Sequence, residues 1–548
     1  MAGRELFTVF RRRQLGVVPS VEQLHHADGD PGPVITRFGP PFRTLLGRSL
    51  LAVAVAAAPI AISLLLVDRW LNRSLREYLP IQSDELSNWH QSATFAAVGF
   101  DNGYYSYQEQ IGAVSGYGPW GPGFAVLMGA GMRVIGTSYL SVVAICMAAV
   151  FLIVAGALAF ARVPWQRVLL VGVVLATFPP MLIYLPSGMQ ESLHLAIAVL
   201  MATLFARLLQ APPGGRQRLA IALVATCSAA ALIRPTWALM LVAVAAAAAR
   251  GRPARVMWIW VGAATASALG FAVIYMAWAA PFPYLALAHI RAASGIDQLS
   301  LLGDNVWANL RLLLIAPGLV MYTNSVQHYQ LIALLGVGVL LVVWWSRIRN
   351  GTDVAALSRA VGVTVLLAVV PPTALIIVLY DMENGTRTLA PCVLFSALLL
   401  ALVPVPRAWV VPVVLVASNL AALSLLQHDF VTRNRLNFDG DRTRVAAAQA
   451  ELGRMMRFRA DAEPWCNTVL SATDYGLRYE LAAVPAGFGI GIDYNHQFRG
   501  PLKSAYVIAT SDFLTKFPAT TTLRQLSQTS LGNLYLNQNS PCFQHRAD

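Results

Sequence analysis

Runs of about twenty apolar residues recur along this chain, and they restrict its fold more than any other feature of the sequence. They extend from residue 51 to about residue 426, and the 548-residue chain is 57% hydrophobic, with a mean hydropathy of +0.57. A hydrocarbon core ~30 Å thick needs about 20 apolar residues per helix. The sequence therefore predicts a mainly α, polytopic bundle of membrane-spanning helices.

The first apolar run, at 50–67, predicts a span that the mature protein keeps. It begins about fifty residues into the chain, and no small-residue cleavage site accompanies it. A cleaved signal peptide would have such a site.

Arginines indicate the orientation of the spans, because short cytoplasmic loops are enriched in basic residues. Seven arginines place segment 1–48 in the cytoplasm, and later short loops are basic as well. Alternation from this start puts residues 427–548 outside and predicts eleven spans, at 49–67, 139–161, 168–185, 190–209, 217–233, 235–249, 256–279, 327–346, 360–380, 387–403 and 408–426.

The apolar run at 122–136 does not fit this alternation. It is either a re-entrant or interfacial helix, or a crossing that is matched by a second one at 310–322. The expected number of spans is therefore 11 to 13.

The net charge of +13 comes largely from the same arginines that make the short loops basic. In a polytopic protein such charge reports orientation, so no nucleic-acid partner is expected. The sequence also lacks a Walker A motif, a GxGxxG after a strand and an HExxH pair. An ATP-driven pump and a zinc protease are therefore not expected.

The acidic residues gather on the predicted outer side. Residues 121–427 contain six acids, and of these only Asp353 falls on the cytoplasmic side. The first outer loop, 68–120, contains six acids, of which we group Asp84, Glu85, Asp101 and Glu109 with the others. Acids at membrane depth are costly and usually functional, so we expect a shared site at the outer face; exclusion of acids from the inner face is the alternative. The outer acids are Asp84, Glu85, Asp101, Glu109, Glu191, Asp297, Asp304, Asp381 and Glu383.

The segment SDELSNWHQSATFAAVGF in this first loop predicts a short helix with Ser83 as its N-cap. Its apolar side chains, which include Leu86, Trp89 and Phe95, suit a helix that lies along the membrane surface. The adjacent acids Asp84 and Glu85 fall in the first helical turn, where a carboxylate also simply stabilises the helix start.

This arrangement resembles the GT-C superfamily of integral membrane glycosyltransferases, which use polyprenyl-phosphate-linked sugars. The resemblance rests on an acidic pair early in the first outer loop, a helix behind it, the tyrosine-rich stretch GFDNGYYSYQEQ, the turn GYGPWGPGF, many spans and an outer C-terminal domain. It implies that Asp84 is the general base on the acceptor hydroxyl, with Glu85 as support or metal ligand. The carboxylates allow a divalent cation, but no ligand spacing specifies one.

Sugar transfer from a phosphate carrier needs cations that stabilise the leaving phosphate. Arg234, in a break between two spans, is one candidate, and a pair with Glu191 is its alternative role. Arg387 is the second candidate, for which an ion pair with Glu383 is the alternative. In GT-C proteins a polar turn with an arginine often lies near the late spans, and an acidic residue often follows the turn that corresponds to the one before Glu191.

Residues 427–548 change character and predict a small extracytoplasmic α/β domain. The segment TRVAAAQAELGRMMRFRA predicts a helix, and NTVLSATD, KSAYVIATSD and NLYLNQN predict strands. Its two cysteines, Cys466 and Cys542, are expected to form a disulfide, because the outer compartment is oxidising.

These observations predict a glycosyltransferase in a bacterial inner membrane that moves a sugar from a polyprenyl-phosphate-linked donor to a glycan, lipid or protein acceptor on the outer face. Tyr104 and Tyr105 are expected either to shape the sugar pocket or to mark the membrane interface. The alternatives are a transporter or flippase, and a polysaccharide polymerase or ligase. Ionisable residues at span ends, rather than mid-span, favour the enzyme over the transporter.

Overall fold

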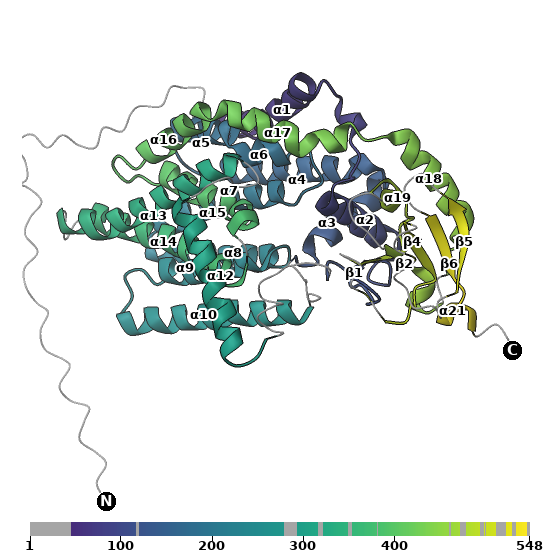
Figure 1. Ribbon diagram of the computed structural model, residues 1–548. Coiled ribbons are helices and arrows are strands. Elements are labelled where there is room, and N and C mark those ends of the chain that lie inside the picture. Colours follow the sequence, from purple (N-terminus) through teal and green to yellow (C-terminus); the bar gives the residue numbers. More distant parts are fainter. Residues whose placement is uncertain are drawn as a thin grey trace, which may run out of the picture.

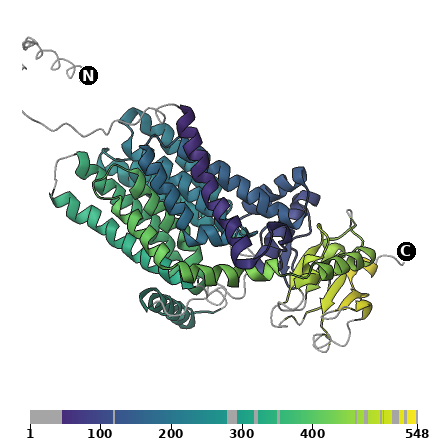
Figure 2. The ribbon, with the colours of Figure 1, turned by 90° about the horizontal axis from the view of Figure 1, so that it is seen from above.

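The computed structural model describes residues 45–116, 120–278, 293–315, 322–348, 353–380, 382–459, 462–471, 478–493, 498, 500–510, 514, 522–528 and 533–544. Figure 1 shows a large bundle of helices with a small mixed sheet at one end, and Figure 2 shows the same sheet standing beyond the bundle when seen from above. The expected mainly α fold with a small C-terminal α/β unit is confirmed.

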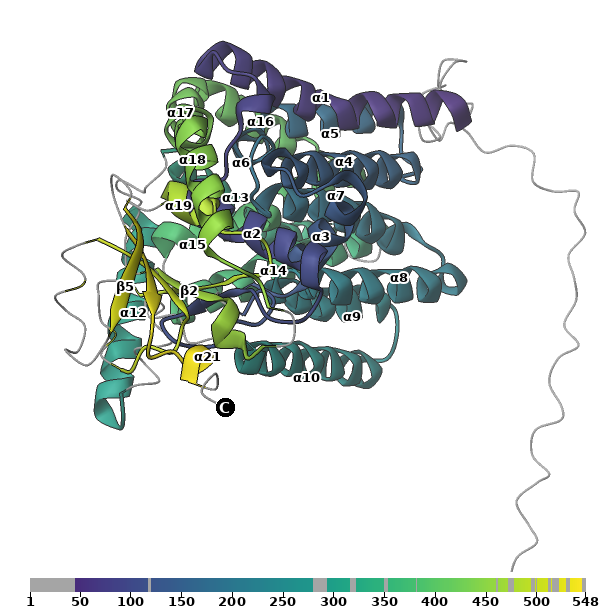
Figure 3. The same ribbon diagram turned by 90° about the vertical axis from the view of Figure 1, so that its right-hand side faces the viewer.

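The bundle is built from helices that follow the apolar runs. Figure 3 shows α1, α4, α7, α8 and α10 running in roughly one direction. The helices up to α10 are α1 (Leu45–Leu71), α2 (Ser83–Val98), α3 (Gly123–Ile135), α4 (Tyr139–Ala159), α5 (Trp165–Thr177), α6 (Pro179–Tyr184), α7 (Glu191–Gln210), α8 (Pro213–Ala231), η3 (Pro235–Leu239), α9 (Met240–Ala248) and α10 (Ala254–Trp278). The later ones are α12 (Ile296–Ile315), α13 (Tyr322–Ile348), α14 (Asp353–Leu379), α15 (Met382–Leu402), α16 (Val410–Ala421) and α17 (Leu423–Phe438).

Six helices of the described residues are long and apolar enough to cross a membrane: α1, α4, α7, α10, α13 and α14. The bent pair α16 and α17, with 66° between its halves, makes up to seven. Shorter apolar helices account for other expected spans and for the run at 122–136: Gly123–Ile135, Trp165–Thr177, Pro235–Ala248 and Arg387–Leu402. The second ambiguous run, 310–322, lies partly in α12 and partly outside the described residues, so the total of 11 to 13 crossings stays a prediction.

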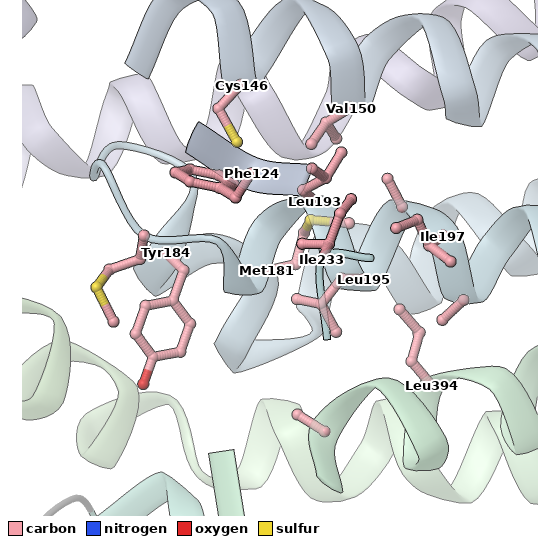
Figure 4. Packing of buried hydrophobic residues seen from close by; sticks show 14 of the residues in the cluster. Phe124, Cys146, Val150, Met181, Tyr184, Leu193, Leu195, Ile197, Ile233 and Leu394 are labelled. Atoms are coloured by element: carbon pink, nitrogen blue, oxygen red, sulfur yellow. The ribbon is translucent and has the colours of Figure 1, made fainter. Parts of the chain in front are cut away.

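Helix α7 lies at the centre of the bundle. Nearly all of its side chains are buried, and it packs against α4, α8 and α15. Figure 4 shows Leu193, Leu195 and Ile197 of α7 packed among Val150 of α4, Leu394 of α15 and neighbouring side chains. Its first residue, Glu191, is thereby held at the end of the bundle that the sheet covers.

The sheet combines residues from the first loop and from the C-terminal segment. Its strand order is β1-β3-β2-β4-β6-β5; the first four strands are parallel, while β6 is antiparallel to both β4 and β5. The strands are β1 (Tyr105–Tyr107), β2 (Thr468–Ser471), β3 (Gly489–Ile492), β4 (Tyr506–Ala509), β5 (Leu523–Gln528) and β6 (Asn533–Asn537). β1 therefore ties the loop after α2 to a sheet that lies more than 350 residues later in the chain.

Helices α18 (Arg442–Met455), α19 (Arg478–Ala482) and α21 (Pro541–Gln544), with the short turns η2 (Leu75–Glu77) and η4 (Pro464–Asn467), complete the structure. The helix predicted over 443–460 forms as α18, which ends at Met455, and the predicted strands that became β2, β4 and β6 are confirmed. Cys466 and Cys542 form a disulfide with their Cα atoms 5.4 Å apart, as expected.

Helix α2 forms where it was expected, but it does not lie open on a membrane surface. Leu86, Trp89 and Phe95 are buried within the protein, and so are polar side chains of a neighbouring face, including His90 and Thr94. The C-terminal segment covers that polar face: the His90 Nε2 atom lies 2.7 Å from the Phe488 carbonyl, and Thr94 accepts a hydrogen bond from the Gly487 amide. The predicted Ser83 N-cap is also wrong, because Gln82 is the N-cap and Ser83 is the first helical residue.

Candidate functional site

Four charged side chains of alternating sign form a continuous network where α2 meets the bundle. Asp84 Oδ2 lies 2.9 Å from Arg387 Nη2, and Arg387 Nε lies 3.8 Å from Glu191 Oε1. The same Glu191 oxygen accepts a hydrogen bond of 3.2 Å from Arg234 Nη2. The structure thus brings together four residues whose contacting pairs are 43 to 303 positions apart in the sequence.

Local structure fixes each member of this network. Asp84 and Glu191 lie in the first turns of α2 and α7, where the helix dipole favours a negative charge. Arg234 is the N-cap of η3, and Pro235 in the first position of that helix ends α8 before it. Arg387 lies in α15 between this turn and α2.

Arg234 is almost completely buried, with 3% of its side chain exposed. Its guanidinium lies 4.9 Å from the centre of the Trp120 ring, which adds a cation–π contact to the ion pair with Glu191. The expected alternative role of Arg234, a pair with Glu191, is therefore present. That pairing does not use all of the donors of the guanidinium.

Glu85 lies in a different environment from its neighbour Asp84. It is fully buried, and its Oε2 atom accepts hydrogen bonds from the Tyr78 hydroxyl at 2.6 Å and the Asn437 amide at 2.7 Å. Its Oε1 atom lies 2.9 Å from Arg433 Nη2 of α17. Glu85 thereby joins the start of α2 to the end of α17, which suits the supporting role that the resemblance implied.

Asn437 completes this junction from the other side. Its side-chain oxygen accepts hydrogen bonds of 3.1 Å from the backbone amides of both Ile81 and Gln82. These amides lie just before α2 and have no partner within that helix. A single buried side chain of α17 therefore holds the backbone that presents Asp84.

The two adjacent acids differ in exposure and in pKa. The side chain of Asp84 is 38% exposed, whereas that of Glu85 is not exposed at all. Burial raises the pKa of Asp84, but Arg387 and then Arg433 outweigh it, so the pKa lies below the ordinary value of 3.8. Burial raises the pKa of Glu85 above its ordinary 4.5 despite Arg433 and Tyr78. Asp84 is thus an accessible carboxylate that stays ionised at neutral pH.

The three arginines of the site carry donor groups with no hydrogen-bond partner among the described residues. These buried atoms are Arg234 Nε and Nη1, Arg387 Nε and Arg433 Nη1. A guanidinium has five N–H donors, and buried donors are costly when unsatisfied. The site can therefore accept an anion with several oxygens, such as a phosphate, in addition to the carboxylates already present.

A mostly apolar pocket extends from Arg234 into the bundle. Side chains of η3, α9, α14 and α15 line it together with that arginine: Thr236, Trp237, Met240, Ala368, Pro372, Thr388, Pro391, Cys392 and Phe395. Arg234 thus lies between the charged network and an apolar recess.

Some residues singled out in the sequence do not join the network. Tyr104 and Tyr105 are buried in the neighbourhood of the sheet: Tyr104 packs with Phe95 and donates to the Gly99 carbonyl, and Tyr105 opens β1. The backbone of Glu383 lies in α15, but its side chain is outside the described residues, so its expected ion pair with Arg387 stays a prediction. Among the described residues, Arg387 pairs with Asp84 and Glu191.

A metal ligand set is not evident in the geometry. Within the parts of the chain that the structure describes, no group of three or more His, Cys, Asp or Glu side chains is arranged to hold an ion. Glu85, named as a metal ligand by the family resemblance, already has three protein partners.

Sequence reasoning missed Arg433, Asn437 and Tyr78. Arg433 and Asn437 follow the last apolar run by only a few residues and were assigned to the outer domain, but α17 continues through them to Phe438. The signal was the cluster RNRLNFDG at the outer end of that run. Basic and amide side chains at the end of a span indicate a functional site just as acidic side chains do.

No protein-family model matches the chain, and no curated protein matches its sequence. Among solved structures, the chain is similar to the apo oligosaccharyltransferase of Archaeoglobus fulgidus, with a TM-score of 0.44 and 12% identity over 85% of this chain and 69% of that one. It is also similar to ArnT from Cupriavidus metallidurans. The complex with undecaprenyl phosphate gives a TM-score of 0.39 and 12% identity over 90% and 98% of the two chains, and the apo state gives 0.40 and 13% over 89% and 98%.

The matched structures are those of an oligosaccharyltransferase and of ArnT. At TM-scores below 0.5 and identities near 12% the likeness defines neither a reaction nor a substrate. Function is therefore argued from the site.

Proposed function

We propose that this protein is a membrane glycosyltransferase that moves a sugar from a polyprenyl-phosphate-linked donor to an acceptor hydroxyl on the outer face of a bacterial inner membrane. The observation that carries the proposal is the contact between the accessible, ionised Asp84 and Arg387, within a network whose arginines have unused donors. A carboxylate beside a cluster of free guanidinium donors suits a reaction that deprotonates a hydroxyl and releases a phosphate.

The apolar surroundings favour a lipid-linked donor over a soluble one. The charged network lies at the end of a bundle with at least six helices long enough to cross a membrane, and the pocket beside Arg234 is mostly apolar. A polyprenyl chain needs an apolar surface next to the group that binds its phosphate. Arg234 and Arg387 are the residues proposed to hold that phosphate.

In the proposed reaction the acceptor oxygen attacks the anomeric carbon of the sugar. The bond between that carbon and the phosphate oxygen breaks, and its electron pair leaves with the polyprenyl phosphate. The carboxylate of Asp84 takes the proton of the acceptor hydroxyl, and the guanidinium groups stabilise the charge that develops on the phosphate. Glu191 and Glu85 keep the arginines oriented, and Asn437 fixes the backbone before Asp84.

The test is transfer of a radiolabelled sugar from polyprenyl-phosphate donors in membranes that contain wild type or Asp84→Asn at matched expression. We expect Asp84→Asn to lower kcat/KM by about a thousandfold, since general-base catalysis contributes roughly 10²–10⁴. Asp101→Asn is the control, because Asp101 is an exposed acid of the same loop outside the network. Full activity in Asp84→Asn would refute the assigned base.

A transporter would behave differently in the same membranes. It would carry lipid-linked or small substrates across vesicles without forming a product from any donor in a panel of sugars and acceptors. Wild-type protein that transfers no sugar across that panel, but moves labelled donor between leaflets, would contradict the glycosyltransferase.

A further inference from the structure

A second basic site lies at the end of the bundle opposite the charged network. α1 and α5 begin there and α4 ends there, and the three helices enclose a pocket of about 390 Å³ including its open mouth. Arg48 of α1 and Arg162 of the α4–α5 turn line this pocket together with Trp165.

Helix α4 places this pocket one membrane thickness away from the charged network. Its first residue, Tyr139, packs on Trp89 of α2 and donates to the Ala482 carbonyl, so that end faces the sheet. Its last residue, Ala159, lines the pocket. A helix of 21 residues is about 31 Å long, which matches the hydrocarbon core. The pocket therefore opens at the opposite membrane surface.

The chemistry of the pocket fits a phosphate group with an acyl chain below it. Arg48 and Arg162 are both exposed, and neither forms an ion pair or a hydrogen bond among the described residues. The first turns of α1 and α5 add partial positive charge. The remaining wall is apolar, with Leu158 and Val168 buried and the others half-buried: Leu51, Leu158, Ala159, Val163 and Val168.

The enrichment of arginine in cytoplasmic loops explains why arginines occur on this side of the bundle. It does not require that two of them line one pocket with an apolar wall. The backbone of Arg162 adopts the left-handed conformation, with φ of +48°, which is uncommon for a residue other than glycine. This turn brings Arg162 to the same pocket as Arg48, over 100 residues earlier in the chain.

We propose that this pocket binds the phosphate headgroup of an anionic phospholipid, with the two guanidinium groups on the phosphate, Trp165 at the interface and one acyl chain along the apolar wall. Under the orientation proposed above, this is the cytoplasmic leaflet, where anionic lipids meet basic side chains. The site is separate from the proposed transfer reaction and does not depend on it.

The test is native mass spectrometry of the full chain in detergent, titrated with phosphatidylglycerol, with phosphatidylcholine of the same acyl chains, and with glycerol phosphate. We expect the wild type to retain phosphatidylglycerol about tenfold more tightly than the other two. Arg48→Gln with Arg162→Gln should lose about tenfold of that affinity, since two basic contacts are removed. Arg69→Gln with Arg454→Gln removes the same charge from exposed positions outside the pocket and should change nothing.

Each result decides the proposal. Equal retention of the two phospholipids would overturn it, and so would equal losses in the two double variants. Binding of glycerol phosphate as tight as that of the lipid would show a site for free phosphate instead of a lipid site. Glutamine is shorter than arginine, but it is polar and the substituted positions are exposed, so both variants are expected to fold. Their melting temperatures are compared with that of the wild type.

Discussion

At the scale of residues, two adjacent acids have separate tasks. The sequence presented Asp84 and Glu85 as one pair, because nothing in SDEL distinguishes them. The structure separates them by what comes from elsewhere in the chain: Arg387 reaches the exposed acid, while Arg433, Asn437 and Tyr78 enclose the buried one. All of these partners except Tyr78 lie about 300 or more residues away, so local sequence cannot assign them.

The support given by Glu85 can be measured as stability. Replacing Glu85 by Gln removes the carboxylate opposite Arg433, whose side chain is only 14% exposed, and breaking a buried ion pair costs about 3–5 kcal/mol. We expect the free energy of unfolding in detergent, measured at about pH 8, to fall by about 3 kcal/mol. Glu77→Gln is the control, because its pair with Arg73 is exposed and is worth less than about 1 kcal/mol. Equal stability of the two variants would contradict this role.

The dependence of activity on pH distinguishes the two acids as bases. Arg387 holds the pKa of Asp84 below 3.8, so this base stays ionised as pH falls and loses its charge only below that value. We expect kcat/KM to stay flat between about pH 5 and pH 8. The pKa of Glu85 is raised above 4.5, so a base at Glu85 would give a decline of kcat/KM at higher pH. A decline that begins above about pH 5 would assign the proton transfer to another group.

At the scale of elements, the sequence predicted the helices and strands that have their own hydrophobic pattern. It missed the strands that form by pairing with distant segments. The helices of the bundle and strands β2, β4 and β6 have apolar or alternating patterns of their own. β1 has three residues and pairs only with β3 among the described strands, and β3 is Gly-Ile-Gly-Ile and lies between β1 and β2. The sequence predicts that the last span ends near residue 426, whereas α17 continues to Phe438. Arg433 and Asn437 were therefore not expected to lie in a helix at the site.

The junction of the first loop with the sheet depends on a close backbone contact at Gly103. Its φ is +103°, and a Cβ atom there would lie 2.3 Å from the Gly487 carbonyl oxygen. Gly136 has a similar φ of +94° with no atom within 4 Å of such a Cβ, so it is a matched control. Both alanine variants should lose about 1–2 kcal/mol from the left-handed backbone. Only Gly103→Ala should also speed hydrogen exchange in β1, and equal exchange in both variants would show that this contact does not hold the strand.

At the scale of the whole molecule, charge and chemistry divide between the two ends of one bundle. The end next to α2 carries the charged network, the sheet and the disulfide, and the opposite end carries Arg48 and Arg162, which form no ion pair with the residues that the structure describes. The sequence anticipated this division from its arginine distribution. It did not anticipate that the C-terminal segment covers the polar face of α2 and so stabilises the site from residues that take no part in the chemistry.

The proposed orientation can be tested on the unmodified chain, because its only lysines are Lys503 and Lys516. Both follow the last span, and Lys503 is exposed beside the Trp465 ring. A membrane-impermeant amine reagent should label the protein in right-side-out vesicles at these lysines, but in inverted vesicles only at its N-terminal amine. Arg at both positions keeps the charge and should abolish the lysine labelling. Lysine labelling confined to inverted vesicles would reverse the orientation and put Asp84 on the cytoplasmic face, where the disulfide between Cys466 and Cys542 would not be expected to persist.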